Sequence, residues 1–300
     1  MEINDPKIKS GVVAIVGPPN SGKSTLLNTL LGQKISIVSP KPQTTRNRIR
    51  GIVNTSDYQI VLLDTPGLHL ARSPLNREMV RIAQASLTDV DAVLFLIDVS
   101  LPLPPPKNKT AVRYLAGTDR PVLLLLNKID LIEKSALLPM IELYKEVFPF
   151  AAIIPISARQ GYGTEDLYRE LLALLPWGPR LYPEDIPTDA TERFIVGEII
   201  REKIFLQTGQ EVPYATAVSI DSFQENETGG LVVIHATIYV EKASQKGIVI
   251  GKGGSKLQQI GKLARADIET LLAQKVLLKL WVKVRQNWTR DPRFLKELGY

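Results

Sequence analysis

The sequence of 300 residues contains no cysteine. This absence excludes a disulfide framework, a cysteine-based metal site and a catalytic thiol. Long apolar runs are also missing, since a run such as VLLLL at 122–126 is far too short to span a bilayer. The N-terminal stretch MEINDPKIKSG has no apolar segment of the signal-peptide type. With 44% hydrophobic and 23% charged residues, the composition is typical of a globular protein, for which we expect a cytoplasmic location.

The charge of the chain is unevenly distributed. Net charge is +6, yet between Lys242 and Lys296 there are thirteen Lys and Arg against three Asp and Glu, so the rest of the chain is net negative. A basic C-terminal region favours a polyanionic partner, either nucleic acid or an anionic membrane. A solvated basic surface without a partner is the alternative interpretation.

Short β-branched runs alternate with helical patterns in the first part of the chain. The runs lie at 12–17, 60–65, 92–98, 121–128 and 153–157. This alternation predicts an α/β domain with a mostly parallel sheet and helices on both faces. Functional loops are then expected at the carboxyl ends of the strands. We place this domain at residues 1–180.

Two proline-dense stretches interrupt the pattern. LPLPPPKNK at 101–109 predicts an extended surface loop, because four prolines in so few residues exclude a helix. The second stretch, 175–189, lies between two apolar helical patterns. It predicts an interdomain linker, which we place at 181–192, with a second domain at 193–300.

GPPNSGKS at 17–24 satisfies the pattern G-x-x-x-x-G-K-[ST] between a predicted strand and a predicted helix. In that context the backbone N–H groups are expected to cradle phosphates, Lys23 to reach the β- and γ-phosphates, and Ser24 to ligate Mg²⁺. Nucleotide-contacting residues are predicted over this whole loop: Gly17, Pro18, Pro19, Asn20, Ser21, Gly22, Lys23, Ser24 and Thr25.

Three further motifs follow at the ends of later strands. LLDTPG at 62–67 places Asp64 to hold Mg²⁺ and Gly67 to turn its N–H towards a γ-phosphate; Thr65, Pro66 and Leu68 flank them. In LLNKID at 125–130, Asn127 and Asp130 match the hydrogen-bonding edge of guanine, and Lys128 would lie along the base. PISARQG at 155–161 would close over the base through Ser157, Ala158 and Arg159. The ordered set predicts a GTP site, because adenine lacks the donor pair that Asp130 would accept from.

This ordered set resembles the translation-factor-related GTPases, and the resemblance implies a mobile switch element between the first two motifs. KPQTTRNRIRG at 41–51 fits that element, with Thr45 favoured over Thr44 as a Mg²⁺ ligand; a basic loop followed by an edge strand is a compatible interpretation. We take the catalytic set to be Lys23, Asn20, Thr45 and Gly67, and the metal set to be Ser24, Thr45 and Asp64.

The expected catalytic apparatus lacks a water-orienting glutamine. Leu68 stands where Ras-like enzymes place it, directly after D-x-x-G, and leucine cannot polarise water. Asn20 stands where a subset of these GTPases uses asparagine to hold K⁺, a charge that would replace an arginine finger. We therefore expect slow intrinsic hydrolysis that is stimulated by K⁺ or by a partner. His69 is expected to be a passive loop residue.

GKGG at 251–254 lacks the G-K-[ST] ending and lies in a different context. Its surroundings predict the order α-β-β-α-α-β, with the glycine turn between two helices, which is similar to a type II KH domain of α+β fold. Such a loop clamps single-stranded nucleic acid. The RNA-contacting residues are predicted to be Ile248, Ile250, Gly251, Lys252, Gly253, Gly254 and Lys256. A helix–turn–helix joint with solvated lysines is the plainer alternative.

A GTPase domain followed by a KH domain resembles the Era-type GTPases, and the resemblance covers essentially the whole chain. PNSGKSTLLN, PQTTRNRI, DTPGLH, EIIREKI, VIGKGG and LKELGY carry it. Pro18 and Ser21 depart from the family pattern, in which Arg or Lys and Val are usual. The resemblance implies a GTP-hydrolysing ribosome-assembly factor that binds the 3′ end of small-subunit (16S) rRNA and acts in 30S subunit biogenesis. It also implies GTP and GDP states, Mg²⁺, peripheral association with the inner membrane, no DNA partner and a monomer.

Three other functions fit parts of the sequence. The basic C-terminal region could serve membrane association of a GTPase. The missing glutamine is compatible with a nucleotide-gated RNA-binding module of negligible turnover. A ribosome factor with two GTPase domains is disfavoured, because there is no second G-x-x-x-x-G-K-[ST] pattern.

Overall fold

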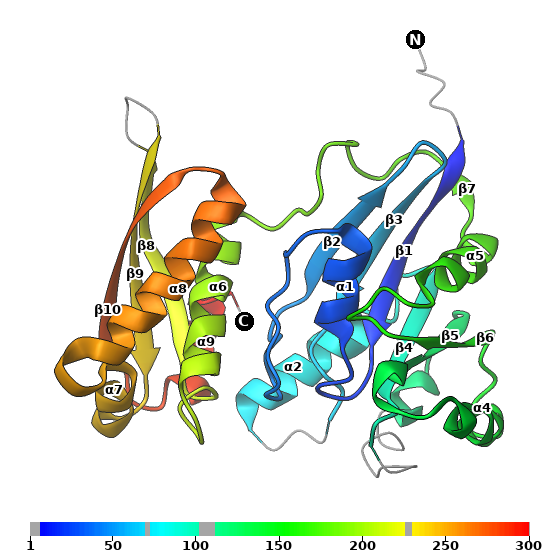
Figure 1. Ribbon diagram of the computed structural model, residues 1–300, viewed down its shortest axis with the longest axis horizontal. Helices are drawn as coiled ribbons and strands as arrows, with labels where there is room; N and C mark the ends of the chain where they lie inside the picture. Colours follow the sequence, from blue (N-terminus) through cyan, green and yellow to red (C-terminus); the bar gives the residue numbers. More distant parts are fainter. Residues whose placement is uncertain (1–6, 70–72, 102–111, 226–229, 300) are drawn as a thin grey trace. The chain divides into compact units, whose positions relative to one another are not determined.

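Contacts divide the chain into two units in the computed structural model, which describes residues 7–69, 73–101, 112–225 and 230–299. The first unit comprises 1–36, 45–72 and 76–189, and the second comprises 37–44, 73–75 and 190–300. The predicted proline loop at 101–109 lies almost wholly outside the described residues. Each unit is described by itself below (Figure 1).

The first unit is built on a sheet with the strand order β2-β3-β1-β4-β5-β6, and β7 pairs with β1. The strands are β1 (Ile8–Val16), β2 (Ile49–Asn54), β3 (Tyr58–Asp64), β4 (Ala92–Asp98), β5 (Val122–Asn127), β6 (Ala152–Ile156) and β7 (Trp177–Gly178). All pairings from β3 to β6 are parallel, whereas β2 and β7 add antiparallel edges. The predicted parallel sheet is confirmed.

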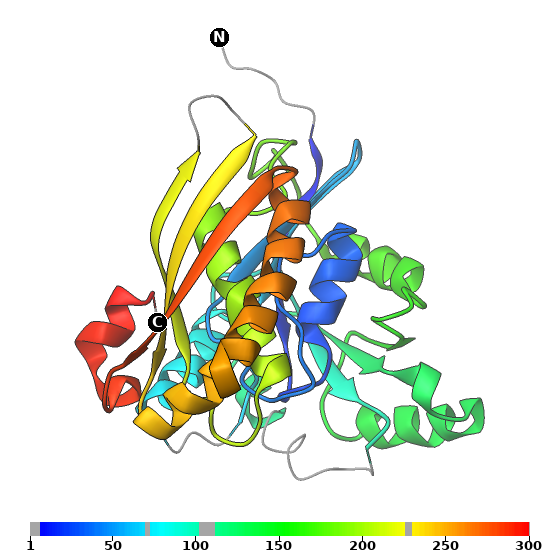
Figure 2. The same ribbon diagram turned by 60° about the vertical axis from the view of Figure 1, so that its left-hand side comes forward.

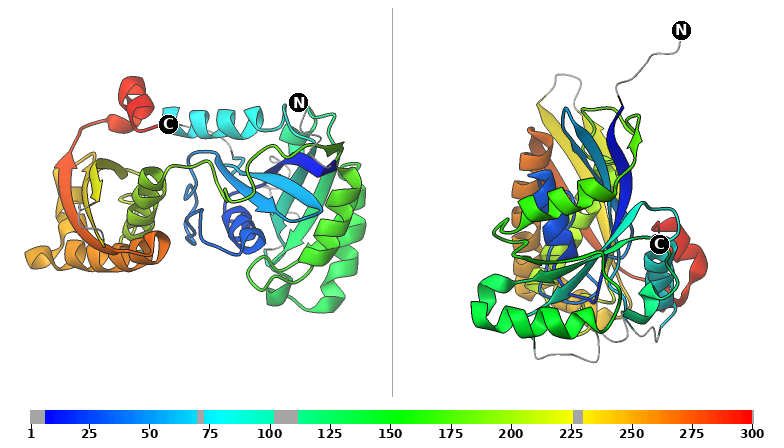
Figure 3. Two further views of the ribbon diagram at one scale, coloured as in Figure 1. Left: turned by 90° about the horizontal axis from the view of Figure 1, so that it is seen from above. Right: turned by 90° about the vertical axis from the view of Figure 1, so that its right-hand side faces the viewer.

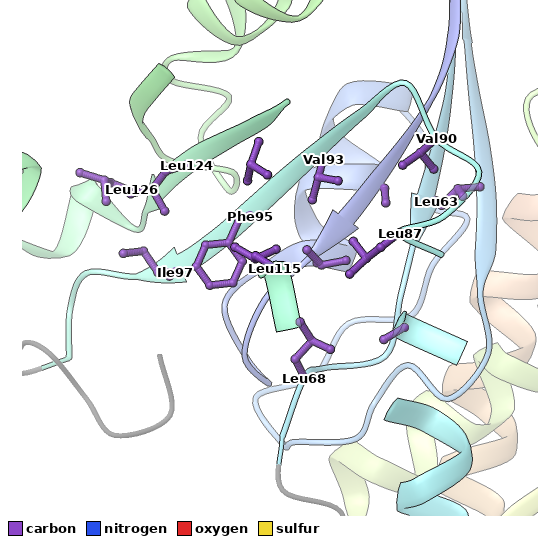
Figure 4. Packing of buried hydrophobic residues seen from close by; sticks show 14 of the residues in the cluster. Leu63, Leu68, Leu87, Val90, Val93, Phe95, Ile97, Leu115, Leu124 and Leu126 are labelled. Carbon is purple, nitrogen blue, oxygen red and sulfur yellow. The ribbon is translucent and has the colours of Figure 1, made fainter. Parts of the chain in front are cut away.

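Helices cover both faces of this sheet. They are α1 (Lys23–Leu31), α2 (Pro74–Ala85), α4 (Leu137–Lys145) and α5 (Thr164–Leu174), with short 3-10 turns η1 (Ile129–Leu131) and η2 (Lys134–Ala136). Side chains of alternate strand residues gather in one hydrophobic cluster, where Phe95 and Leu124 meet Leu87 and Leu115 (Figure 4). On the opposite face α1 buries Leu26 and Leu27, and α5 buries Leu167 and Leu171. Burial on both faces explains why the strands read as continuous apolar runs.

The proline-rich stretch is not a free linker. The backbone N–H of Ile52 in β2 donates to the carbonyl oxygen of Pro187 at 2.8 Å, and the Thr188 hydroxyl donates to the carbonyl of Arg50. The buried amide of Gln59 accepts from the N–H groups of Leu181 and Tyr182. Residues 181–189 therefore pack on the first unit. The division between the two units, at 189/190, lies inside the linker predicted at 181–192, whose bounds stay a prediction. Pro187 itself lacks an N–H group, so it bonds to β2 through its carbonyl.

The second unit has the predicted order α-β-β-α-α-β. The elements are α6 (Glu192–Gln207), β8 (Ala217–Glu225), β9 (Leu231–Val240), α7 (Ala243–Ile250), η3 (Lys252–Gly254), α8 (Ser255–Leu272) and β10 (Lys275–Val284), followed by η4 (Trp288–Arg290) and α9 (Pro292–Glu297). The sheet order is β10-β9-β8, with β9 antiparallel to β8 and parallel to β10. Helices α6 and α8 pack together and against this sheet (Figures 1 and 2).

Candidate functional sites

The loop between β1 and α1 folds as the sequence pattern predicts. Gly17 and Gly22 have φ angles of 152° and 102°, which L side chains rarely adopt. A Cβ atom at Gly17 would lie 2.2 Å from the carbonyl oxygen of Leu96, and one at Gly22 would lie 2.2 Å from Nδ2 of Asn127. The glycines are thus required for close backbone approach to β4 and β5. Helix α1 begins at Lys23, so its N-terminal N–H groups follow the loop directly.

Lys23 is a buried cation. It is 6% exposed, and its ammonium group donates to the carbonyl oxygens of Gly17 and Pro18 at 3.2 and 2.8 Å. Burial lowers the pKa of Lys23 to about 8, although the neighbouring Asp64 carboxylate acts in the opposite direction. An anion beside this ammonium group would favour its charged form.

Four oxygen-bearing side chains, those of Asp64, Ser24, Thr45 and Ser36, meet at the carboxyl end of β3. The hydroxyl of Ser24 donates to Oδ2 of Asp64 at 2.7 Å and lies 2.8 Å from the hydroxyl of Thr45. Ser36, which the sequence analysis did not single out, also donates to Oδ2 of Asp64 at 2.7 Å. Burial raises the pKa of Asp64, while hydrogen bonds from Ser24, Ser36 and Thr45 and the charge of Lys23 lower it. Of the adjacent threonines, Thr45 lies at this cluster, whereas the Thr44 hydroxyl contacts Ser39 and the Lys41 carbonyl.

This cluster fits a magnesium ion. Among the described residues, the second oxygen of Asp64, Oδ1, is buried and has no hydrogen-bond partner. A buried carboxylate oxygen without a donor is costly unless a cation neutralises it. Hydroxyl and carboxylate oxygens are the ligands that Mg²⁺ takes in proteins, usually with few protein groups. Ser24, Thr45 and Asp64 are therefore the residues that would hold it.

The D-T-P-G loop after β3 touches the first glycine loop. A Cβ atom at Gly67 would lie 2.8 Å from both Cα and N of Pro19, so only glycine fits there. The N–H of Leu68 donates to the carbonyl of Gly17 at 3.0 Å, and the Thr65 hydroxyl donates to the carbonyl of Ile15. The Leu68 side chain is 1% exposed and enters the hydrophobic cluster beside Phe95 and Leu115 (Figure 4).

His69 follows the same loop. Its Nδ1 lies 2.6 Å from the carbonyl oxygen of Gly67, so Nδ1 carries the hydrogen of that bond. Within the described ranges, Nε2 of His69 is buried without a hydrogen-bond partner. The ring is thus anchored to the loop it follows, and its passive role stays a prediction.

Asn127 ties two loops to each other. Its Nδ2 donates to the carbonyl of Ser21 at 2.7 Å, and its Oδ1 accepts from the N–H of Ala158 at 2.9 Å. The residue is 2% exposed. The sequence pattern predicted a contact with the base; the structure adds a tie between the phosphate loop and the 155–161 loop. The N–H of Ser157 likewise donates inside the protein, to the carbonyl of Tyr162. Base contacts of these groups stay predictions.

The rest of the predicted base site lies nearer the surface, with Asp130 exposed and Lys128 half-buried. Asp130 lies on the surface in η1, and Lys128 adopts a left-handed backbone conformation with φ 71° while its ammonium group pairs with Asp98 at the end of β4. Asn20 is exposed and has a left-handed φ of 64°. The other residues predicted to contact the nucleotide lie in these loops or in the first turn of α1: Pro18, Pro19, Thr25, Pro66 and Arg159. The four motifs therefore converge at the carboxyl ends of β1, β3, β5 and β6, as expected of a nucleotide site.

The second glycine loop joins α7 to α8. Gly251, Gly253 and Gly254 all have left-handed φ angles, of 74°, 59° and 82°. A Cβ atom at Gly251 would lie 2.7 Å from Cβ of Lys256, whereas Gly253 and Gly254 face open space. Lys252 is exposed at the tip of the turn. Because α8 has 18 residues and begins at Ser255, its N-terminus adds a positive field to this turn.

An open cleft of about 830 Å³ runs from this turn between α8 and the edge strand β10. Its walls come from both elements: Gly254, Ser255, Leu257, Gln258, Gln259, Gly261, Lys262, Arg265, Leu277, Leu278 and Leu280. Ile248 and Ile250, which were predicted to line the groove, are not among these residues. Ile248 is 43% exposed on α7. Leu257 and Gly261 lie four residues apart on one helix face, a spacing that could have identified this wall.

Segment 37–44 is held by α6 within the second unit. The N–H of Val38 donates to Oε1 of Glu202 at 2.9 Å, and the Lys41 ammonium group donates to the carbonyls of Phe205 and Thr208. Arg201, which is fully buried, donates to the carbonyl of Thr44 and pairs with Glu198. The sequence does not reveal this network, because a charged helix face gives no signal of burial.

Lys203 of α6 joins this network of charged side chains to Asp267 of α8. Its ammonium group lies 2.8 Å from Glu202 and 2.6 Å from Asp267. Burial lowers the pKa of Lys203, but the hydrogen bonds that its ammonium group donates to Asp267 and Glu202 outweigh this effect and raise that pKa overall. In the described part of the chain, no helix is long and apolar enough to cross a membrane.

Two family models match the chain. A model described as 50S ribosome-binding GTPase matches residues 12–128, and one described as KH domain matches 211–289. The chain is 54% identical to the GTPase Era of Geobacter metallireducens over 99% of this chain and all of that protein. It is 49% identical to the GTPase Era of Lactobacillus delbrueckii, covering 98% and 97% of the two chains.

Two solved structures have the same fold over nearly their whole length. The structure of Era in complex with MgGDPNP and nucleotides 1506–1542 of 16S ribosomal RNA matches with a TM-score of 0.94 at 41% identity, over 98% of this chain and 99% of that one. A point variant of Aquifex aeolicus Era bound to GDP·AlF4⁻ matches with a TM-score of 0.94 at 40% identity and the same coverage. With its four nucleotide motifs, its KH fold and these full-length relatives, the chain belongs to the Era family of GTPases.

Proposed function

We propose that this chain hydrolyses GTP at the loops of its first unit and binds single-stranded 3′-terminal 16S rRNA in the α8–β10 cleft of its second unit. The observation that carries the proposal is that one chain holds both a buried Ser24–Thr45–Asp64 cluster beside a phosphate loop and an open cleft beside a left-handed glycine turn. The Era structure with MgGDPNP and 16S rRNA supports both assignments. The biological role is assembly of the small ribosomal subunit.

Hydrolysis is attack of water on the γ-phosphorus, which breaks the bond to the oxygen bridging to the β-phosphate. Lys23 meets the charge that spreads over the phosphate oxygens, and the N–H groups of the glycine loop and Gly67 fix their position. Mg²⁺, when held by Ser24, Thr45 and Asp64, neutralises charge between the β- and γ-phosphates. Asp130 selects guanine by accepting from its N1–H and 2-amino groups.

Guanine selection is tested by the Asp130→Asn variant. Xanthine carries a carbonyl where guanine carries the 2-amino group, so an amide at position 130 would donate to xanthosine triphosphate. The expected result is a loss of GTP binding and a gain of xanthosine triphosphate binding. Unchanged GTP affinity would remove Asp130 from the base site.

Turnover is expected to be slow, because Leu68 is buried in the hydrophobic cluster and cannot orient water. Asn20 is expected to hold a K⁺ ion, which would supply the positive charge of an arginine finger. GTP turnover should therefore be higher in K⁺ buffer than in Na⁺ buffer. Equal rates in the two buffers would contradict the role of Asn20. Turnover that stays negligible in both buffers and with RNA would favour a second function, a nucleotide-gated RNA-binding module, which the burial of Leu68 supports.

Sedimentation can show which ribosomal subunit the protein binds. One family model is named for the 50S subunit, whereas the Era complex contains 16S rRNA. Protein loaded with a non-hydrolysable GTP analogue should cosediment with small subunits and their precursors. Cosedimentation with large subunits alone would overturn the assignment.

The same proposal includes a monomer in the cytoplasm that binds RNA and not DNA, with peripheral attachment to the inner membrane face. The basic balance of residues 242–296 supports contact with polyanions of either kind. Fractionation of cells in low and high salt tests the membrane part, since peripheral electrostatic attachment is lost in high salt.

A further inference from the structure

Helix α1 contributes more than Ser24 to the surroundings of Asp64. It lies on the face of the first unit's sheet opposite to α2 (Figure 3), and it continues past Ser24 as far as Leu31. Asn28 follows Ser24 by four residues, so it lies about one turn further along the same side of the helix. The half-buried side chain of Asn28 bonds to the segment that follows α1, at residues 35 and 36.

The amide of Asn28 holds both backbone groups of Ser36. Its Oδ1 accepts from the N–H groups of Ile35 at 3.0 Å and of Ser36 at 2.9 Å, while its Nδ2 donates to the carbonyl oxygen of Ser36 at 2.7 Å. An amide side chain can do this because it carries an acceptor and two donor hydrogens. Residues 35 and 36 belong to no helix or strand, so no ladder of backbone bonds fixes them. The three bonds from Asn28 therefore set the position of Ser36 relative to α1.

Ser36 transmits this position to the carboxylate of Asp64. Both residues are fully buried, and the Ser36 hydroxyl donates to Oδ2 of Asp64 at 2.7 Å. The Ser24 hydroxyl donates to the same oxygen at 2.7 Å. Hydrogen bonds to a carboxylate oxygen prefer the plane of the carboxylate, so two donors from different segments of the chain fix that plane. They leave Oδ1, which is buried and has no hydrogen-bond partner in the part of the chain that the structure describes, as the oxygen available to a cation.

A purely structural tie between this segment and α1 would not need a hydroxyl at position 36. The three bonds from Asn28 all go to backbone groups, which alanine would present equally well. Burial of a hydroxyl costs free energy unless the hydroxyl is hydrogen-bonded. The Ser36 hydroxyl makes its bond to Asp64, the carboxylate of the predicted metal set, which indicates a role in that set.

We propose that Asn28 and Ser36 are positioning residues for Mg²⁺: Asn28 fixes Ser36, and Ser36 orients the Asp64 carboxylate so that Oδ1 is presented to the ion. This proposal rests on the metal set Ser24, Thr45 and Asp64 of the proposed function. It gives Asn28 and Ser36 no contact with the nucleotide, so their effect on nucleotide affinity must depend on Mg²⁺. Partners that orient a metal ligand typically change metal affinity by roughly 10- to 100-fold.

The test measures the affinity of the full chain for a fluorescent GDP over a titration of Mg²⁺ and, separately, in excess EDTA. Ser36→Ala should raise the Mg²⁺ concentration that gives half of the gain in affinity by roughly 10- to 100-fold, and Asn28→Ala should raise it by about tenfold. Both variants should bind GDP in EDTA as tightly as the wild type. A merely structural role would instead weaken GDP binding equally in Mg²⁺ and in EDTA.

A double-mutant cycle tests whether Asn28 acts through Ser36. Once the Ser36 hydroxyl is absent, the position of residue 36 no longer affects the Asp64 carboxylate. Adding Asn28→Ala to Ser36→Ala should therefore change the half-saturating Mg²⁺ concentration by less than about twofold. Effects of the two substitutions that add in full would contradict this order of action.

The matched control is Thr55→Ala, at the end of β3 that is remote from Asp64. Thr55 is half-buried like Asn28, and its side chain also makes three bonds to backbone groups: it accepts from the N–H groups of Asp57 and Tyr58 and donates to the carbonyl oxygen of Tyr58. Thr55→Ala thus removes a similar backbone clamp, and it should leave the dependence of GDP affinity on Mg²⁺ unchanged.

The outcomes separate the proposal from the function on which it rests. Half-saturating Mg²⁺ concentrations that equal the wild-type value in both single variants, or losses of affinity that are the same in Mg²⁺ and in EDTA, would overturn the proposal. Thermal unfolding in EDTA shows whether each variant is folded, and if the fully buried Ser36→Ala site prevents folding, Asn28→Ala decides the matter. If the GDP affinity of the wild type does not respond to Mg²⁺, the metal set of the proposed function fails instead.

Discussion

At the scale of single residues, Lys23 couples nucleotide affinity to pH. Burial lowers its pKa to about 8 in the ligand-free protein, and phosphates raise it again. Above pH 8 the free protein must therefore take up a proton to bind, and the affinity for GDP should fall towards tenfold per pH unit between about pH 8 and 9. Titration calorimetry in buffers of different ionisation enthalpy measures that proton uptake.

The control for this pH dependence is Lys23→Arg, because a guanidinium group stays charged across the whole range. A fall in affinity that the wild type and Lys23→Arg share does not arise from the titration of Lys23 and is assigned to the nucleotide. An affinity of the wild type that stays constant, or rises, over the same pH range would contradict the assignment of Lys23.

Two buried serines provide a second residue-level prediction. The Ser21 hydroxyl is buried without a hydrogen-bond partner among the described residues, whereas the Ser36 hydroxyl donates to Asp64. Ser21→Ala should leave the free energy of unfolding unchanged or raise it by up to about 1 kcal/mol, while Ser36→Ala should lower it by about 1–3 kcal/mol. Urea unfolding of both variants measures the difference, and a larger loss for Ser21→Ala would show that its hydroxyl has a partner.

At the scale of elements, the loop after β3 packs against the glycine loop after β1. Gly67→Ala forces a methyl group against Pro19, and the overpacking should cost about 1–3 kcal/mol. Because this contact positions the phosphate loop, GTP affinity should fall by roughly five- to a hundredfold. The matched control is Gly117→Ala, where nothing lies within 4 Å of the added Cβ. Equal affinities of the two variants would show that the loops move apart freely.

The attachment of residues 181–189 to β3 is a second element-level prediction. Gln59 is fully buried and bonds to the backbone of Leu181 and Tyr182 through three hydrogen bonds. Gln59→Leu leaves these groups unpaired, so unfolding should become about 2–4 kcal/mol easier and proteases should cut within 181–189. Gln84→Leu, on the exposed face of α2, should change neither quantity. Resistance to protease in Gln59→Leu would mean that the segment is held by other contacts.

The sequence predicted the elements well and the burial of polar groups poorly. The parallel strands and the α-β-β-α-α-β order follow from apolar periodicity and glycine positions, which are local signals. The packing of 181–189 was not predictable, because the sequence of a proline-rich stretch is the same whether its backbone is solvated or hydrogen-bonded to a neighbouring strand. The exposure of Trp281, which alternates with apolar residues along its strand, was not predictable either, because alternation does not tell which face of a strand is buried.

At the scale of the whole molecule, the predicted switch element at 41–51 is divided between the two units. Residues 37–44 belong to the second unit, where they contact α6, and Thr45 belongs to the first unit, where its hydroxyl lies 2.8 Å from that of Ser24. The ammonium group of Lys41 donates to the carbonyls of Phe205 and Thr208 at the C-terminal end of α6, where the helix dipole favours a cation. Lys41→Met should therefore loosen residues 37–45 and raise their hydrogen-exchange rates about tenfold. Lys134→Met is the control, and unchanged exchange in 37–45 would contradict the role of Lys41.

The central claim is that one chain combines a GTP site with a cleft for single-stranded 16S rRNA, and equilibrium binding tests it most directly. The measurement is the affinity of GTP-analogue-loaded protein for a labelled 3′-terminal 16S strand and for a scrambled strand, in the wild type and in a Gly253→Asp, Gly254→Asp variant. We predict tight binding of the true sequence that the variant abolishes, because two carboxylates would repel the phosphates at the turn. Weak binding that is equal for both strands and for both proteins would contradict the account.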